Sequence, residues 1–320
     1  MSTINQQYLT FDTTQTQQIE SIIEIWNAAC NENLALAPRF AEYTLHPPAD
    51  VHMVGRFALH DDQPVGFILA SYLADAPHVM PPERGCIHAI ALLPSAQHMG
   101  IGTQLLDWAE EWLAGQGCTS IQVGASIHPF APGLPDTLPS LSFFQKHGYI
   151  NSGSVWDVSR NLADYMPPAC VHPIEGVVHP AQPGQEDALL DFMQREFPGG
   201  WTYECQDFLA ASGRISDYML LWTERGVDGF CQLTFEDSLP RPIERFYPYR
   251  LPRPWGQLGP IGISEDQRGK GYGAAVLDAG LRRLHNNGVN GCVIDWTTIV
   301  DFYGKFGFER YQEYIQLEKR

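Results

Sequence analysis

The chain repeats itself at an offset of 171 residues, and this duplication restricts its fold more than any other feature of the sequence. The segment QHMGIG, which begins at Gln97, aligns with RGKGYG, which begins at Arg268, and the register holds without gaps as far as Gly117 and Gly288. Each copy must bury its own apolar faces, so the duplication predicts two domains of one kind. The length of 320 residues agrees, since one domain typically has roughly 150.

In both copies an apolar strand is followed by a glycine loop and then by a helix. The apolar positions of both helices recur at a spacing of 3.6 residues, and each helix is expected to end in a left-handed residue near Gly117 or Gly288. Upstream, each copy shows a strand, helical patterns and a hairpin of strands. This alternation predicts an α/β fold, with a first domain at 1–165 and a second at 166–320. The proline-rich residues 163–185 at the boundary form either a linker or an extended strand that enters the second domain.

Further along, FFQKHGY, which begins at Phe143, aligns with FYGKFGF, which begins at Phe302, now at an offset of 159. The first copy therefore contains twelve extra residues, which we assign to the proline-rich segment from Pro129 to Pro139. Proline cannot donate hydrogen bonds to a helix or a sheet, so this segment is interpreted as a surface insertion.

Composition excludes several classes of protein. Hydrophobic residues make up 44% of the chain, which is typical of a folded protein, and no apolar run reaches the ~18 residues of a membrane helix. The first residues lack the pattern of a signal peptide, so we expect a cytoplasmic protein. A net charge of −17 disfavours nucleic acid and anionic membranes as partners. Seven scattered cysteines without a CxxC motif indicate reduced thiols, and no metal site is expected.

The second glycine loop has the features of an anion site. A strand that enters RGKGYG and then a helix directs backbone N–H groups and the positive end of the helix dipole at one point. Gly271 and Gly273 allow a pyrophosphate to approach the backbone closely. Pro260 and Gly262 interrupt the preceding apolar strand, which predicts a bulge or an unpaired edge with backbone groups left for a ligand that carries amides.

Together, these segments resemble two tandem GCN5-related N-acetyltransferase (GNAT) domains, in which a mixed, mostly antiparallel sheet is flanked by helices. The acetyl-CoA loop of that family reads [RQ]xxGx[GA]. The resemblance implies that acetyl-CoA is the cosubstrate, that the backbone of the second loop holds its pyrophosphate, and that the preceding strand pairs with its pantetheine arm. The residues concerned are Arg268, Gly269, Lys270, Gly271, Tyr272 and Gly273 in the loop, Ile261, Gly262 and Ile263 in the strand, and Gln97, Gly100 and Gly102 in the first copy.

The resemblance also places a proton-donating tyrosine at Tyr303, where the first copy has Phe144, which has no proton to give. The second copy is therefore expected to be catalytic and the first to be a degenerate copy, although its loop backbone can still suffice for binding. Asp295, Glu265 and Asp266 are the candidates for the general base, of which Asp295 is preferred for its position, with a chain of water molecules as the alternative. His88 is either a base, if the first copy is active, or a core histidine.

The expected function is transfer of an acetyl group from acetyl-CoA to an amine of a small molecule or peptide by direct attack, in a monomer or homodimer. The arginine- and aromatic-rich segment from Glu236 to Trp255 either lines the acceptor pocket or covers the boundary between domains. Two alternatives remain open at this point: a non-catalytic CoA-binding or regulatory module, and an enzyme whose active site lies in the first copy.

Overall fold

The computed structural model describes residues 7–12, 14–30, 32–242 and 251–320, which form two compact units. Within these ranges the first unit contains residues 7–155 and 313–320, and the second contains residues 156–242 and 251–312. The units part between Val155 and Trp156, not after residue 165, and residues 313–320 return to the first unit.

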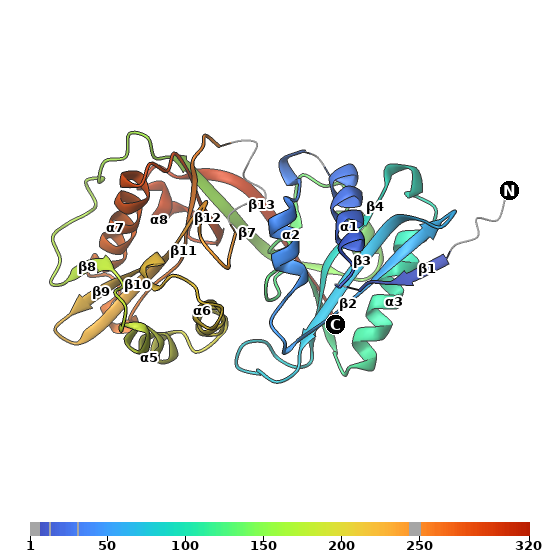
Figure 1. The fold of residues 1–320 in the computed structure, drawn as a ribbon, viewed down its shortest axis with the longest axis horizontal. Helices are drawn as coiled ribbons and strands as arrows, with labels where there is room; N and C mark the ends of the chain where they lie inside the picture. The colour runs from blue at the N-terminus through green and yellow to red at the C-terminus, as the bar shows by residue number, and fades with distance from the viewer. Residues whose placement is uncertain (1–6, 13, 31, 243–250) are drawn as a thin grey trace. The chain divides into compact units, whose positions relative to one another are not determined.

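Both units contain the same succession of helices and longer strands, and the first unit adds the short strand β6; Figure 1 labels most of these elements. The first unit consists of β1 (Gln7–Thr10), α1 (Thr16–Ala29), α2 (Pro38–Leu45), β2 (Val51–His60), β3 (Gln63–Leu73), β4 (Arg84–Leu92), α3 (Ile101–Gly115), β5 (Ser120–Val123), β6 (Leu134–Pro135) and α4 (Leu141–Lys146). The second consists of β8 (Val177–Pro180), α5 (Glu186–Glu196), α6 (Gly200–Ala210), β9 (Tyr218–Thr223), β10 (Gly226–Phe235), β11 (Trp255–Ile263), α7 (Tyr272–Asn286), β12 (Gly291–Thr297) and α8 (Val300–Gly304). Two longer strands, β7 (Ile150–Asn161) and β13 (Glu309–Lys319), follow α4 and α8.

Each unit has a mixed, mostly antiparallel sheet, which confirms the expected fold class. In the first unit β1, β2, β3 and β4 are antiparallel neighbours, and β5 runs parallel to β4. In the second, β8, β9, β10 and β11 are antiparallel neighbours, and β12 runs parallel to β11. Each sheet therefore contains one parallel pair, and in both units a glycine loop and a long helix connect its two strands.

The units exchange their last strands. The half of β7 from Trp156 to Asn161 belongs to the second unit, where it pairs with β12. The end of β13 belongs to the first unit, where Leu317–Lys319 pair with β5 and Tyr314 and Ile315 pair with β6. This exchange explains why the observed units differ from contiguous halves of the chain.

Helices cover both faces of each sheet, and alternate residues of the strands contact them. In the second unit, Phe230 of β10 packs with α5 and α6, whereas Cys231, the next residue, packs with α7. The predicted left-handed helix ends are confirmed, because Gly117 and Gly288 have φ angles of 90° and 81°. The sequence pattern of these helices thus directs their apolar stripes into the core.

The expectation that Pro129–Pro139 forms a surface insertion is wrong for most of its length. Phe130 is fully buried and stacks on Trp26 of α1, with ring centroids 5.6 Å apart. Leu134 is also buried, and Leu134 and Pro135 form strand β6. Proline is acceptable here because β6 is only two residues long, and the aromatic and aliphatic side chains between the prolines gain free energy from burial.

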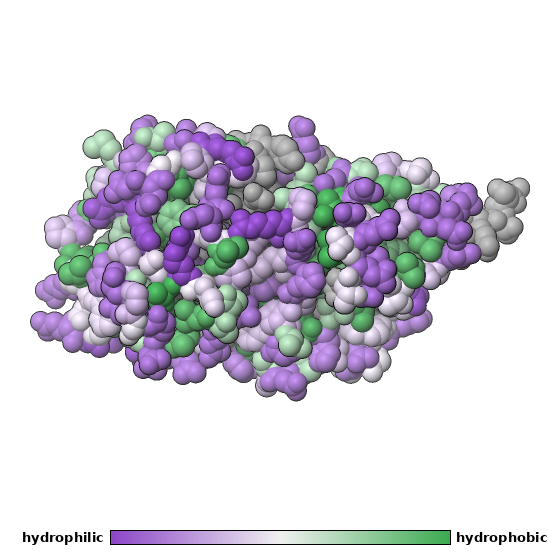
Figure 2. All heavy atoms as spheres, in the orientation of Figure 1, coloured by the Kyte–Doolittle hydropathy of each residue, from purple (hydrophilic) through white to green (hydrophobic). Residues whose placement is uncertain are grey.

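Hydrophilic side chains cover much of the visible face of the described residues, and the apolar ones occur in small groups (Figure 2). None of the helices in the described part of the chain is both long and apolar enough to cross a membrane. All seven cysteines are free thiols.

Candidate active site

Strands β11 and β12 separate part of the way along their length. They pair only from Trp255 to Gln257, opposite Gly291 to Val293. On its other side, β11 changes register against β10 between Leu258 and Ile261, so Gly259 and Pro260 form a bulge. The bulge expected from Pro260 is confirmed. Beyond it, the edge of β11 that faces β12 has no ladder partner among the described residues, which leaves backbone groups for a ligand.

The glycine loop follows at the end of this strand. Gly269 and Gly271 have φ angles of 81° and 86°, in the left-handed region that glycine adopts without strain. Gly271 lies directly before α7, whose first N–H groups have no partner within the helix. Left-handed residues at alternate positions turn successive N–H groups toward one point, so the loop and the helix start together present the backbone donors that an anion site requires.

The residues predicted to bind the cofactor lie together at this place. Ile261, Gly262 and Ile263 pair with β10 by one edge, and Gly262 and Ile263 are buried. Arg268, Gly269, Lys270 and Gly271 are exposed, Gly273 is half-buried in the first turn of α7, and Tyr272 is buried, where its hydroxyl donates to the Glu175 carbonyl at 3.1 Å. The structure thus combines an exposed cationic loop with a buried strand that leads into it.

Tyr303 and Asp295 are neighbours in the second unit. Tyr303 of α8 is only 4% exposed and hydrogen-bonds to Thr297. Burial, and secondly the Asp295 carboxylate, raise the pKa of the Tyr303 phenol well above its usual value. Asp295 is 11% exposed and lies 3.4 Å from the guanidinium of Arg241. A protonated, buried phenol therefore lies within electrostatic range of a partly buried carboxylate.

Glu265 does not join this pair. It lies beyond the end of β11 in the single helical turn Glu265–Gln267, with an exposed side chain. Its backbone N–H donates to the Glu196 carboxylate at 3.0 Å. Asp295 instead lies in the middle of the site, because its Oδ1 would be 3.4 Å from a Cβ at Gly259 in the bulge. Asp266 pairs with Arg225, so of the three candidate bases Asp295 is the one whose charge acts on Tyr303.

The first unit keeps the loop, and its parallel strands β4 and β5 also pair only as far as Ile87 and Val123, but a different residue stands at the place of Tyr303. His98 and Gly100 have φ angles of 61° and 82°, which match Gly269 and Gly271, and Gln97 donates to the Leu92 carbonyl at 3.1 Å. Gly102 corresponds to Gly273 in the first turn of the helix. Phe144, at the place of Tyr303, is 2% exposed. The backbone of an anion site is therefore present without the phenol.

His88 occupies the bulge of β4, at the position of Gly259 in the repeat. Its ring is buried and lies 2.5 Å from the Ser71 hydroxyl and 2.8 Å from the Ser126 hydroxyl. Burial, with a smaller contribution from His128, lowers the pKa of His88 to about 3. His88 is thus a neutral core histidine whose ring fills space that a glycine leaves open in the second unit.

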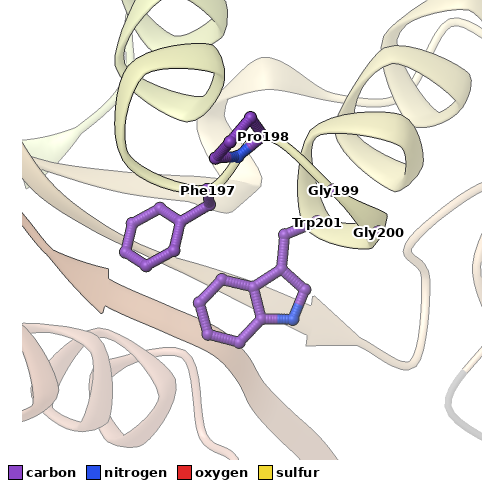
Figure 3. Close-up of a pocket in the computed structure, with 5 residues that line it drawn as sticks. All are labelled: Phe197, Pro198, Gly199, Gly200 and Trp201. Atoms are coloured by element: carbon purple, nitrogen blue, oxygen red, sulfur yellow. The ribbon is translucent and has the colours of Figure 1, made fainter. Parts of the chain in front are cut away.

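Two aromatic features were missed in the sequence. A pocket of about 460 Å³ is lined by residues from the end of α5 to the start of α6, namely Phe197, Pro198, Gly199, Gly200 and Trp201 (Figure 3). The Phe197 ring lies against Gly262, where a Cβ would come within 2.4 Å of it. The paired glycines between two aromatic residues were the available signal, and Gly262 serves this close approach.

Trp296 is the second missed feature. It has a φ angle of 51°, unusual for a bulky residue, and is 38% exposed beside Asp295. The fully buried Asp157 carboxylate accepts its backbone N–H at 2.9 Å and so holds this conformation. No sequence signal marks it, since the stabilising carboxylate is 139 residues away.

The segment expected to line or cover the acceptor pocket is described only in part. Arg245 and Arg250 lie outside the described residues. Arg241 contacts Asp295, whereas Arg253 contacts Glu236 at 3.2 Å and lies over the Trp255 ring. Of the two described arginines, Arg241 is the one at the candidate site. Among the residues that the structure describes, no group of three or more metal-ligating side chains could hold a metal ion.

Comparisons with known proteins agree with this arrangement. The model of the acetyltransferase (GNAT) family matches residues 19–149 and 186–308. A mycothiol acetyltransferase of Catenulispora acidiphila is 26% identical over 244 residues, which cover 71% of this chain and 70% of that protein. A tandem GNAT protein from the clavulanic acid biosynthesis pathway has a similar fold, with a TM-score of 0.69, 12% identity and coverage of 98% of both chains.

A glucosamine N-acetyltransferase region of a fungal multi-domain GH3 β-N-acetylglucosaminidase superposes with a TM-score of 0.88 at 21% identity. The match covers 99% of this chain and 38% of that one, so this chain spans well under half of the fungal protein.

Proposed function

Because the chain belongs to the acetyltransferase (GNAT) family, we propose that it is an acetyl-CoA-dependent N-acetyltransferase whose second unit carries the active site. The observation that supports this most directly is the buried phenol of Tyr303 beside Asp295, at a strand split that leads to a glycine-lined anion site. The first unit has Phe144 and the filled bulge of His88 at the equivalent places.

The described residues fit the coenzyme. A Cβ at Gly269 would meet no atom within 4 Å, so the loop has an open, backbone-lined surface on which the pyrophosphate can rest. Arg268 and Lys270 add positive charge at the same loop. The edge of β11 beyond Gln257 offers backbone groups to the amides of the pantetheine arm. The coenzyme supplies the thioester, and the chain supplies its position.

The proposed reaction is direct attack of a neutral amine on the thioester carbonyl. The C–N bond forms, the C–S bond breaks, and the Tyr303 hydroxyl gives its proton to the departing thiolate. The proton that the amine loses as the amide forms restores the phenol. A raised pKa keeps Tyr303 protonated at neutral pH, as a proton donor requires. Asp295 is placed to orient the amine, to receive the proton that it loses and to pass this proton on to Tyr303, directly or through water.

The acceptor is proposed to be a small-molecule amine attached to a saturated ring, such as an amino sugar. The ring C–H groups of a sugar pack well on aromatic faces, and the half-exposed rings of Trp201 and Trp296 offer two such faces in this unit. The name of one relative specifies glucosamine, an amino sugar, which supports the same class.

Calorimetric titration with acetyl-CoA tests the proposal. The wild-type chain is expected to bind one equivalent, Gly271→Glu to bind none, and the matched variant Gly100→Glu to bind as the wild type does. Both glycines have left-handed φ angles, so the two substitutions strain equivalent places in the repeat. Binding lost only in Gly100→Glu would move the site to the first unit. Binding without transfer to any amine of a broad panel would indicate a non-catalytic CoA-binding module.

A further inference from the structure

A buried polar cluster holds the segment that leads into the glycine loop. Asp228 of β10 is 1% exposed and accepts hydrogen bonds from the Ser264 hydroxyl at 2.9 Å and the Thr223 hydroxyl at 2.5 Å. Ser264, the first residue after β11, is fully buried, and its backbone N–H also donates to the Asp228 carbonyl at 2.9 Å. Two contacts thus join Ser264 to one residue of the neighbouring strand.

The next two residues are held as well. The Glu265 N–H donates to the Glu196 carboxylate of α5, and the Asp266 carboxylate pairs with Arg225 at 2.5 Å. Arg225 also lies 3.5 Å from Asp228. Ser264, Glu265 and Asp266 are therefore fixed by groups from β10, α5 and the β9–β10 turn, directly before the exposed loop begins at Arg268.

The first unit closes the same junction without these polar side chains. There the Leu93 N–H donates to the Val65 carbonyl at 2.8 Å, the counterpart of the bond from Ser264 to Asp228. Both pairs stand at the same register, because Gly66 opposes Leu92 and Gly229 opposes Ile263. Val65 and Leu93 pack in apolar clusters. The fold itself therefore does not require a carboxylate at this place.

Burial of a carboxylate costs free energy that hydrogen bonds and nearby charge only partly return, and apolar replacements of such groups are often neutral or stabilising. We propose that Asp228 and Ser264 are positioning residues for the acetyl-CoA loop: they fix its entry so that the N–H groups of residues 268–273 point at the pyrophosphate before it binds. This inference rests on the proposed function. Gly269 and Gly271 make the loop conformationally free, and a fixed entry lowers the ordering that binding would otherwise require.

The test removes the cluster and follows CoA affinity and stability separately. The double variant Asp228→Val/Ser264→Ala approximates the first unit and is expected to bind CoA about 10-fold more weakly by calorimetry, the order expected when preorganisation is lost. Its urea midpoint is expected to equal or exceed that of the wild type, and kcat at saturating acetyl-CoA to stay within about twofold. The single variant Asp228→Asn keeps an acceptor oxygen for Ser264, so it is expected to bind CoA with most of the wild-type affinity.

The matched control is Val65→Asp/Leu93→Ser, which introduces the polar pair into the first unit and is expected to leave CoA affinity unchanged. Should the double variant unfold, Ser264→Ala alone, which leaves Thr223 on Asp228, is expected to raise the Kd for CoA by about threefold, since one of the fixing contacts remains. Wild-type CoA affinity in the variants, with binding intact in the parent, would overturn the positioning role alone. Absence of CoA binding in the parent would overturn the proposed function and this inference with it.

Discussion

Replacing Tyr303 with phenylalanine isolates the proposed proton donor, because it removes one hydroxyl and keeps the ring. Phe144 is buried at the equivalent place of the first unit, so a phenyl ring is already accommodated there. The hydroxyl forms a hydrogen bond with the Thr297 side chain. We therefore expect the free energy of unfolding to fall by about 1 kcal/mol, the net contribution of a typical hydrogen bond.

Turnover should fall far more than stability. A positioned general acid contributes about 10²- to 10⁴-fold to a rate, which corresponds to about 3–5 kcal/mol of barrier. Because burial and Asp295 raise the pKa of Tyr303 above the usual 10.0, the phenol keeps its proton through neutral and mildly alkaline pH. Wild-type kcat should therefore show no decline from loss of this proton until the pH rises above about 10.

The assay measures initial rates of transfer from radiolabelled acetyl-CoA to an amine that the wild type acetylates, together with calorimetric CoA affinity. We expect a drop in kcat of at least about 100-fold with an unchanged Kd for CoA. Tyr165→Phe is the matched control, because it removes another buried tyrosine hydroxyl, bonded to Asp278, away from the split. A Tyr303→Phe variant with wild-type kcat would refute the role of the phenol.

Three further changes probe other parts of the structure. Trp296→Ala is expected to lower kcat/KM for the acceptor about 10-fold and to leave the KM for acetyl-CoA unchanged, as removal of an acceptor contact should; the reverse pattern would place Trp296 on the coenzyme. Phe130→Ala is expected to lower the free energy of unfolding by about 3–5 kcal/mol in urea titrations, whereas a surface residue would change it by under about 0.5 kcal/mol. The pKa of His88 is about 3 in the folded chain and near 6.5 when unfolded, so the unfolded state gains the proton first as pH falls. Stability linked to His88 is thus complete above pH 6.5 and decreases toward pH 3, by about 2 kcal/mol at pH 5. His88→Gln should remove this part of the acid dependence, and equal losses between pH 7 and pH 5 in both proteins would contradict it.

The local features of the site could be predicted from the sequence because each is set by neighbouring residues. Glycine at 269 and 271 determines the left-handed turns of the loop, Pro260 determines the bulge, and the 3.6-residue stripe determines which face of α7 is buried. The repeat then extends the predictions of the loop and of the helix to the first copy. These features account for the order of elements and for the placement of the coenzyme residues.

The remaining features depend on contacts between distant segments. Asp228 and Ser264 are 36 residues apart, and Asp157 and Trp296 are 139 apart, so no local pattern joins either pair. Phe130 is buried because its ring stacks on Trp26, a residue more than 100 positions away. The prolines around Phe130 indicate only a surface loop. The sequence also does not show whether β7 and β13 pair within their own copy or with the other copy. Either pairing would bury the same alternating side chains.

The exchange of β7 and β13 between the units determines the order in which the two sheets can be completed during synthesis. When residues 1–155 have left the ribosome, one edge of β5 is still unpaired. Its partner, residues 317–319 of β13, is synthesised only after almost the whole second unit. Until then that edge can recruit a strand from another molecule. A cut at the midpoint of the gene would therefore give two fragments that each carry the other's closing strand, and mixing them should rebuild both sheets only in the paired complex.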